Sequence, residues 1–222
     1  MNENKIRCSW CGVDPLYVAY HDDEWGIPVH DDRVLFEFLT LEWAQAWLSW
    51  ITVLRKRENY RKYFHNWNIE KISNMTDSEL ENILLDPGVV RNRLKIYSVR
   101  KNAIVAIQIQ QEFWSLDAYF WNSSFCHREE WNDPEKQKGI PCSDWITSLA
   151  RNDECNQIFP IINHPRTMSE FVSESDISRK ISKDLKKRGM SFIGSTIIYA
   201  FMQAVGMADD HINTCFRKKN FL

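Results

Sequence analysis

Thiol and imidazole side chains lie near both ends of this chain. Cys8 and Cys11 form a Cys-x2-Cys pair, His21 follows it, and His211 and Cys215 form a His-x3-Cys pair. Either group alone would suit ordinary buried residues. Together they offer the donors of structural Zn²⁺, which takes four such ligands in a tetrahedron. The residues therefore predict one metal site built from both termini, with Cys8, His211, Cys215 and either His21 or Cys11 as ligands.

Three amphipathic rings are interleaved with the N-terminal donors, namely Trp10, Tyr17 and Tyr20. Such rings can stack on a planar ligand or pack inside a core. Helical periodicity by itself favours the core, so these rings alone do not define a binding site.

The composition is that of an ordinary globular protein. Hydrophobic residues make up 44% of the 222 positions, enough for the core of one large or two small domains. The formal net charge of -2 argues against bulk attraction to nucleic acid but allows a local basic face. We see neither an apolar run of about 18 residues nor the pattern of a targeting peptide. We therefore expect a cytoplasmic protein with reduced cysteines.

Apolar residues recur at helical spacing along most of the chain, and no alternating strand pattern of useful length is present. Thr76 and Glu79 match a capping box, and glycines follow the last two helical patterns. The fold class is therefore predicted to be all-α. One expected helix begins at Asp31 and Asp32. The others run from Trp47 to about residue 64, from Thr76 to Leu84, from Arg91 to Gln110, from Ser173 to Arg188 and from Gly194 to Val205.

Two segments between these helices have a distinct character. The run DPGVVRNR joins two expected helices in a helix-hairpin-helix shape. About residues 122–160 the chain is polar and without clear periodicity, which indicates an insertion. The insertion carries Cys126, His127, Cys142 and Cys155, whose spacings match no common ligand pattern and favour free thiols over a second metal cluster.

Ordered motifs run along the chain, namely RCSW, DPLYVAYHDDEWGIP, LFEFLTLE, QAWLSWITVLRKRENYR, GVVRNRLKI, KKRGMSFIGSTIIYAFMQAVG and DDHINTC. Together they resemble the 3-methyladenine DNA glycosylase I (TAG) family of bacterial base-excision enzymes. The resemblance implies a single glycosylase domain over residues 1–222 in the helix-hairpin-helix superfamily. It also implies a monomer that acts on double-stranded DNA containing alkylated bases in the bacterial cytoplasm. A structural zinc would join the termini through Cys8, His21, His211 and Cys215, leaving Cys11 as a spare thiol.

The resemblance also implies a base pocket formed by Trp10, Tyr17, Tyr20, Glu42 and Trp50. Aromatic faces attract a cationic purine and stack on a flipped base. A carboxylate at Glu42 can accept hydrogen bonds from the exocyclic amine and complement the charge that adenine lacks. Glu42 is thus the expected catalytic residue, acting by recognition and electrostatic stabilisation, because alkylation already makes the base a good leaving group. We assign no general base.

Flipping a base requires a side chain that fills the vacated stack, and Leu48 is the expected wedge. The hairpin from Gly88 to Arg93 can offer backbone N–H groups to a phosphate, with the Arg91 and Arg93 side chains nearby. A second basic cluster could bind phosphate, although charged helix ends are usually only solvated. It comprises Lys183, Lys186, Lys187 and Arg188.

The chain departs from the family pattern at Trp43 and Trp47, where small residues are expected. An indole at either position could fill or reshape the base pocket. We expect the pocket to stay open and the protein to excise 3-methyladenine or a related cationic purine. The alternative is a catalytically weak, zinc-stapled protein that binds damaged DNA or nucleotides on the same scaffold.

Overall fold

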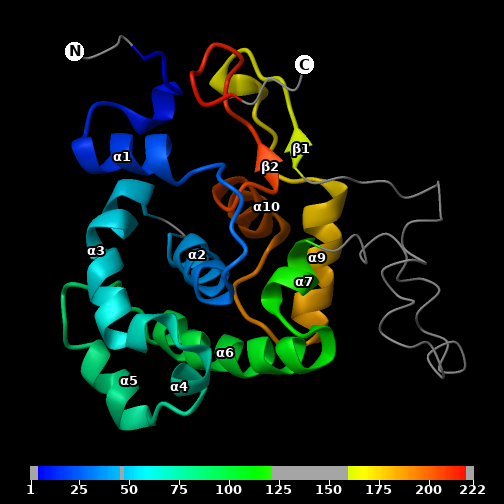
Figure 1. Ribbon diagram of the computed structural model, residues 1–222. Coiled ribbons are helices and arrows are strands. Elements are labelled where there is room, and N and C mark those ends of the chain that lie inside the picture. The colour runs from blue at the N-terminus through cyan, green and yellow to red at the C-terminus, as the bar shows by residue number, and fades with distance from the viewer. Residues whose placement is uncertain (1–4, 46–47, 122–159, 219–222) are drawn as a thin grey trace, which may run out of the picture.

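A computed structural model of the chain describes residues 5–45, 48–121 and 160–218 (Figure 1). Helices dominate the described residues, as the sequence predicts. The α-helices are α1 (Pro15–Asp23), α2 (Asp32–Ala44), α3 (Trp50–Tyr63), α4 (Ile69–Ser73), α5 (Asp77–Ile83), α6 (Arg93–Phe113), α7 (Leu116–Trp121), α9 (Asp176–Lys187) and α10 (Ser195–Ala204). Short 3-10 helices are η1 (Ser9–Cys11), η2 (His65–Trp67) and η4 (Met168–Glu170).

Helix α2 lies in the middle of the molecule (Figure 1). Every residue from Leu35 to Ala44 is buried, and the helix contacts α3, α6, α7 and α10. A helix that is apolar on all sides is stable only when other elements surround it. Glu42 lies within this buried run, so the fold holds the carboxyl group of Glu42 inside the protein.

Capping residues explain where the predicted helices begin. Asp31 accepts hydrogen bonds from the first turn of α2, and Thr76 with Glu79 forms the predicted capping box of α5. The helix expected from Trp47 begins instead at Trp50, because Ser49 has the extended backbone of an N-cap. Trp47 itself lies outside the described residues.

Three helices were not expected from periodicity. Helices α1, α4 and α7 have nine, five and six residues, too few to show a clear apolar stripe. The structure also contains a two-residue parallel pair, β1 (Ile161–Ile162) with β2 (Ala208–Asp209), in an otherwise helical fold. The expected insertion and its Cys126, His127, Cys142 and Cys155 lie outside the described residues. In the described part of the chain, none of the helices is both long enough and apolar enough to cross a bilayer.

Candidate functional site

Four donor side chains from the two ends of the chain meet in one buried cluster. The ligand atoms of Cys8, His21, His211 and Cys215 all lie within 4.8 Å of one another. The Sγ atom of Cys215 lies 3.4 Å from Nε2 of His21 and 3.5 Å from Nδ1 of His211, which is 3.6 Å from Sγ of Cys8. A tetrahedral zinc site places such donors about 3.4–3.8 Å apart, given its bond lengths. The donor set therefore fits a metal ion of that kind.

Side chains around the cluster fix the orientation of its ligands. Asp22 Oδ1 lies 2.9 Å from Nδ1 of His21, which leaves Nε2 facing the thiols. Arg7 holds the same carboxylate through bonds of 2.7 to 3.0 Å and is the main reason that the pKa of Asp22 falls to about 2. Carboxylates commonly orient metal-binding histidines in this way. Neither Arg7 nor Asp22 was predicted from the sequence, although Asp22 directly follows a candidate ligand.

Cys11 lies beside the cluster without belonging to it. Its Sγ atom donates a hydrogen bond of 3.1 Å to the backbone oxygen of Cys8. Of the two choices that the residues left open, the structure groups His21, and not Cys11, with the other three donors.

The four aromatic side chains expected to form a pocket are brought together from three elements. Trp10 from η1 lies 5.2 Å from Tyr17 and 6.3 Å from Tyr20 between ring centroids, and Tyr20 lies 5.4 Å from Trp50 at the start of α3. Asp14 caps α1 and Pro15 occupies its first turn. Tyr17 and Tyr20 lie three residues apart on this helix, so both face the same side, with ring centroids 6.5 Å apart. Tyr20 and Trp50 are buried, whereas Trp10 and Tyr17 are half-buried. The cluster thus has a buried base and a partly exposed edge.

Glu42 lies beside these rings without a hydrogen-bond or ion-pair partner in the described part of the chain. Glu42 is only 4% exposed, and burial raises the pKa of its carboxyl group to about 8. After burial, which is the main cause, the Glu42 charge also helps to raise the pKa of both Tyr17 and Tyr20. An unpartnered buried carboxyl group costs free energy, so such a group is a strong indication of a binding site.

Trp43 points to a different neighbour. It is 1% exposed and stacks on Phe192, with ring centroids 5.8 Å apart. Among the described rings, none of the close pairs joins Trp43 to Trp10, Tyr17, Tyr20 or Trp50. The Trp43 side chain thus packs in the core, against the segment between α9 and α10. Trp47 lies outside the described residues, so the structure does not test the expectation for it.

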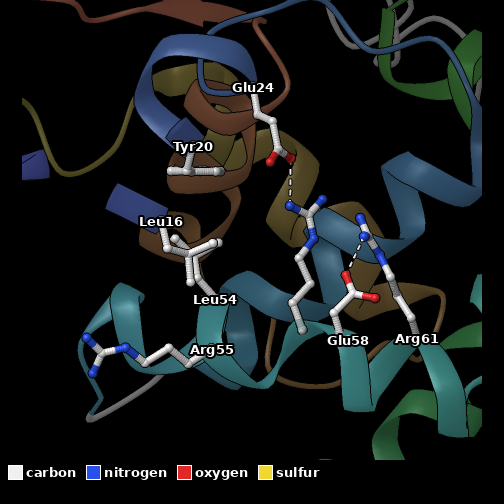
Figure 2. A pocket seen from close by; sticks show the side chains of 8 residues that line it. Leu16, Tyr20, Glu24, Leu54, Arg55, Glu58 and Arg61 are labelled. Atoms are coloured by element: carbon white, nitrogen blue, oxygen red, sulfur yellow. Dashed lines mark hydrogen bonds and ion pairs between the residues drawn. The ribbon is translucent and has the colours of Figure 1, made fainter. Parts of the chain in front are cut away.

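Tyr20 also lines a hollow of about 380 Å³, together with Leu16, Glu24 and side chains of α3 (Figure 2). The charged side chains in its walls are paired. Arg57 binds Glu24 and Glu37 at 2.6 Å, and Arg61 binds Glu37 at 2.8 Å and Glu58 at 2.7 Å. Because these charges already neutralise one another, the hollow lacks the free charge that a ligand site would use. The ring cluster with Glu42 is the stronger candidate.

The residues expected to contact DNA differ in exposure and in whether they already have partners within the protein. Leu48 is 37% exposed just before α3, and Arg91 is exposed. Arg93 pairs with Glu81 at 2.7 Å. The N–H of Gly88 donates to Oδ1 of Asp86 at 2.6 Å, so this amide is already satisfied within the hairpin.

The second basic cluster is divided in the structure. Arg188 bonds with Glu112 and Asp184, and the exposed side chains of Lys183, Lys186 and Lys187 remain on the outer side of α9. Helices α9 and α10 form a second close helix hairpin, which was not predicted from the sequence. Its signal was present in Gly189 and Gly194, since Gly189 has a φ of 103° and Gly194 caps α10.

The whole chain is similar to proteins of one enzyme family. The model of the methyladenine glycosylase family matches residues 10–149 and 142–218. The DNA-3-methyladenine glycosylase 1 of Escherichia coli K12 is 38% identical over 94% of this chain and 95% of its own, and the DNA-3-methyladenine glycosylase of Haemophilus influenzae Rd is 37% identical over 94% and 96%. A Staphylococcus aureus structure, which describes 3-methyladenine recognition by 3-methyladenine DNA glycosylase I, is 27% identical with a TM-score of 0.78 and covers 97% of this chain and 98% of its own.

Proposed function

This chain belongs to the methyladenine glycosylase family, and from that premise we propose that it is a DNA-3-methyladenine glycosylase. It hydrolyses the N-glycosidic bond of 3-methyladenine in DNA: water adds to the sugar carbon and the free base leaves. The observation that carries this proposal is the buried, unpartnered carboxyl group of Glu42 beside four clustered rings.

Recognition in this site depends on charge. A 3-methylated adenine in DNA carries a positive charge that adenine lacks, and each good stack on an aromatic ring contributes on the order of 1–3 kcal/mol. Glu42 has a pKa of about 8 in the free protein because it is buried. A cationic base beside Glu42 favours its ionised form, which then accepts hydrogen bonds from the base. The same carboxylate would gain little from neutral adenine.

The rate enhancement can come mainly from binding and flipping the base. Alkylation already weakens the bond between sugar and base, so interactions that hold the extruded base are sufficient to speed its loss. Hydrolysis of this kind needs no lysine nucleophile. Glu42 therefore acts on the base directly, by electrostatic stabilisation, and Trp10, Tyr17, Tyr20 and Trp50 hold the ring in place.

We also propose that Zn²⁺ is held by Cys8, His21, His211 and Cys215. When bound, the ion supplies folding free energy by joining the chain ends. The ring of His21 lies 5.2 Å from that of Trp10, so the ligand cluster supports one wall of the base pocket. The contribution of these four residues to function is thus to hold Trp10 in position.

Double-stranded DNA is the proposed partner, bound by a monomer in the cytoplasm. Leu48 would enter the vacated stack, and the start of α6 would face a phosphate through its N-terminal dipole with Arg91 and Arg93. In this proposal the hairpin between α5 and α6 is the helix-hairpin-helix unit of the superfamily. Because the Gly88 N–H is already bonded, the phosphate contact falls to later amides and the arginine side chains.

Base release from methylated duplex DNA tests the function. We expect the parent protein to release 3-methyladenine, identified by chromatography of the free bases. Glu42→Gln should fold and lose most of this activity, because the amide cannot complement a cation. Glu58→Gln is the matched control, since Glu58 is an exposed glutamate on α3. Binding of methylated DNA without release of any base would instead favour the weak binding protein.

A further inference from the structure

Lys95 occupies an unusual position for a lysine. It lies in the first turn of α6 and is only 6% exposed. A cation in the first turn meets the positive end of the helix dipole, and lysines are rarely buried unless a partner holds them. Burial also lowers the pKa of Lys95. A specific contact must therefore compensate for the burial of Lys95.

That contact reaches the end of the central helix. The Nζ atom of Lys95 donates a hydrogen bond of 3.0 Å to the backbone oxygen of Ala44, the last residue of α2. The carboxyl end of a helix presents free carbonyl groups and the negative end of its dipole, which a lysine complements. Glu42 lies in this last turn, and the amide of Leu48 donates to the oxygen of Gln45 at 2.6 Å just after it.

The backbone of Lys95 is fixed as well. Its amide donates to Oδ1 of Asn92, the N-cap of α6, at 3.1 Å. One residue thus holds the start of α6, where Arg93 stands, and through its side chain the end of α2. These are the phosphate-binding and base-flipping ends of the proposed DNA surface.

We propose that Lys95 is a positioning residue that sets the wedge Leu48 at the right distance from the phosphate-binding end of α6. This inference rests on the proposed glycosylase function. Lys95 touches neither base nor phosphate; it acts through the last turn of α2. Its role matters for duplex DNA, where a base must be extruded and its place filled, and much less for single-stranded DNA.

The experiment compares Lys95→Met with the parent on methylated duplex and single-stranded DNA. We expect release of 3-methyladenine from the duplex to fall about tenfold or more, as for a small misplacement of a reacting geometry, with only a small change on single strands. Ile109→Ala is the stability control, because Ile109 is buried on the same helix, 14 positions from Lys95. It should lower thermal stability without changing the ratio of duplex to single-strand activity.

A double-mutant cycle with Leu48→Ala identifies the route of the effect. If Lys95 acts through the wedge, the Lys95→Met loss on duplex DNA should largely vanish in the Leu48→Ala background. Equal losses on both DNA forms, or additive losses in the cycle, would overturn the inference while leaving the glycosylase function intact. A parent protein that releases no 3-methyladenine would contradict the proposed function itself.

Discussion

The Sγ atom of Cys215 lies 3.4 Å from Nε2 of His21, although 194 residues separate them in the chain. Through this pair and its two neighbours, the N-terminal segment that carries Trp10 and Tyr17 is joined to the last residues of the protein. The position of Trp10 therefore depends on the cluster that joins the two segments, because Trp10 packs on the ring of His21.

Replacement of a cluster thiol should remove the metal and weaken the fold. We expect close to one zinc per purified chain by metal analysis, and loss of most of it in Cys215→Ala. Thermal unfolding of that variant should occur about 10 °C lower, since each kcal/mol shifts the midpoint by roughly 2–4 °C at this size. Cys11→Ala is the control and should keep its zinc. Loss of zinc from Cys11→Ala but not from Cys8→Ala would show that the ligand assignment is wrong.

Glu42 should make stability depend on pH. Its folded pKa of about 8 lies above its ordinary value of 4.5, so the folded state binds the proton more tightly. This contribution to stability is complete below about pH 4.5 and is lost as the pH rises through about 8. Glu42→Gln cannot ionise there. As the pH rises from 5 to 8.5, the melting temperature of the variant should therefore increase relative to that of the parent. A constant difference across this range would argue against the raised pKa.

Trp43 should matter for stability and not for pocket access. Its indole is buried against Phe192, so Trp43→Ala should cost about 3–5 kcal/mol in denaturant unfolding. Trp43→Gly should cost roughly 1 kcal/mol more through helix propensity. Neither change should raise the release of 3-methyladenine when assayed on folded protein. A strong gain of excision in Trp43→Gly would mean that the indole obstructs the base.

Arg57, which lines the hollow beside Tyr20, should be a structural ion-pair residue. It bonds Glu24 and the buried Glu37 at 2.6 Å. Arg57→Met removes one of the two cations that compensate the buried Glu37, which keeps Arg61 at 2.8 Å, so the change should destabilise the protein by roughly 2 kcal/mol. Arg55→Met is the control on the same helix, because an exposed ion pair such as Arg55–Asp14 contributes little to stability. Similar unfolding curves for both variants would contradict this assignment.

The sequence by itself determined the family and the helical class, and the family resemblance supplied the candidate members of both clusters. The starts of helices could be predicted from local signals. Asp31, Thr76 and Glu79 cap helices through hydrogen bonds between their side chains and nearby amides, and such bonds depend on only a few adjacent residues. The family confirmed by comparison follows from motifs that occur in order along the chain. The ring pocket was inferred from that resemblance, because periodicity alone favoured core residues.

Only the tertiary structure decided which residues are neighbours. The residues left His21 and Cys11 as equal choices, and the fold separates them, because His21 turns toward Cys215 while the Cys11 thiol bonds to a backbone oxygen. It likewise directs Trp43 to Phe192 and Lys95 to Ala44. These contacts join segments far apart in the chain, and their geometry depends on how whole helices pack, which no local pattern encodes.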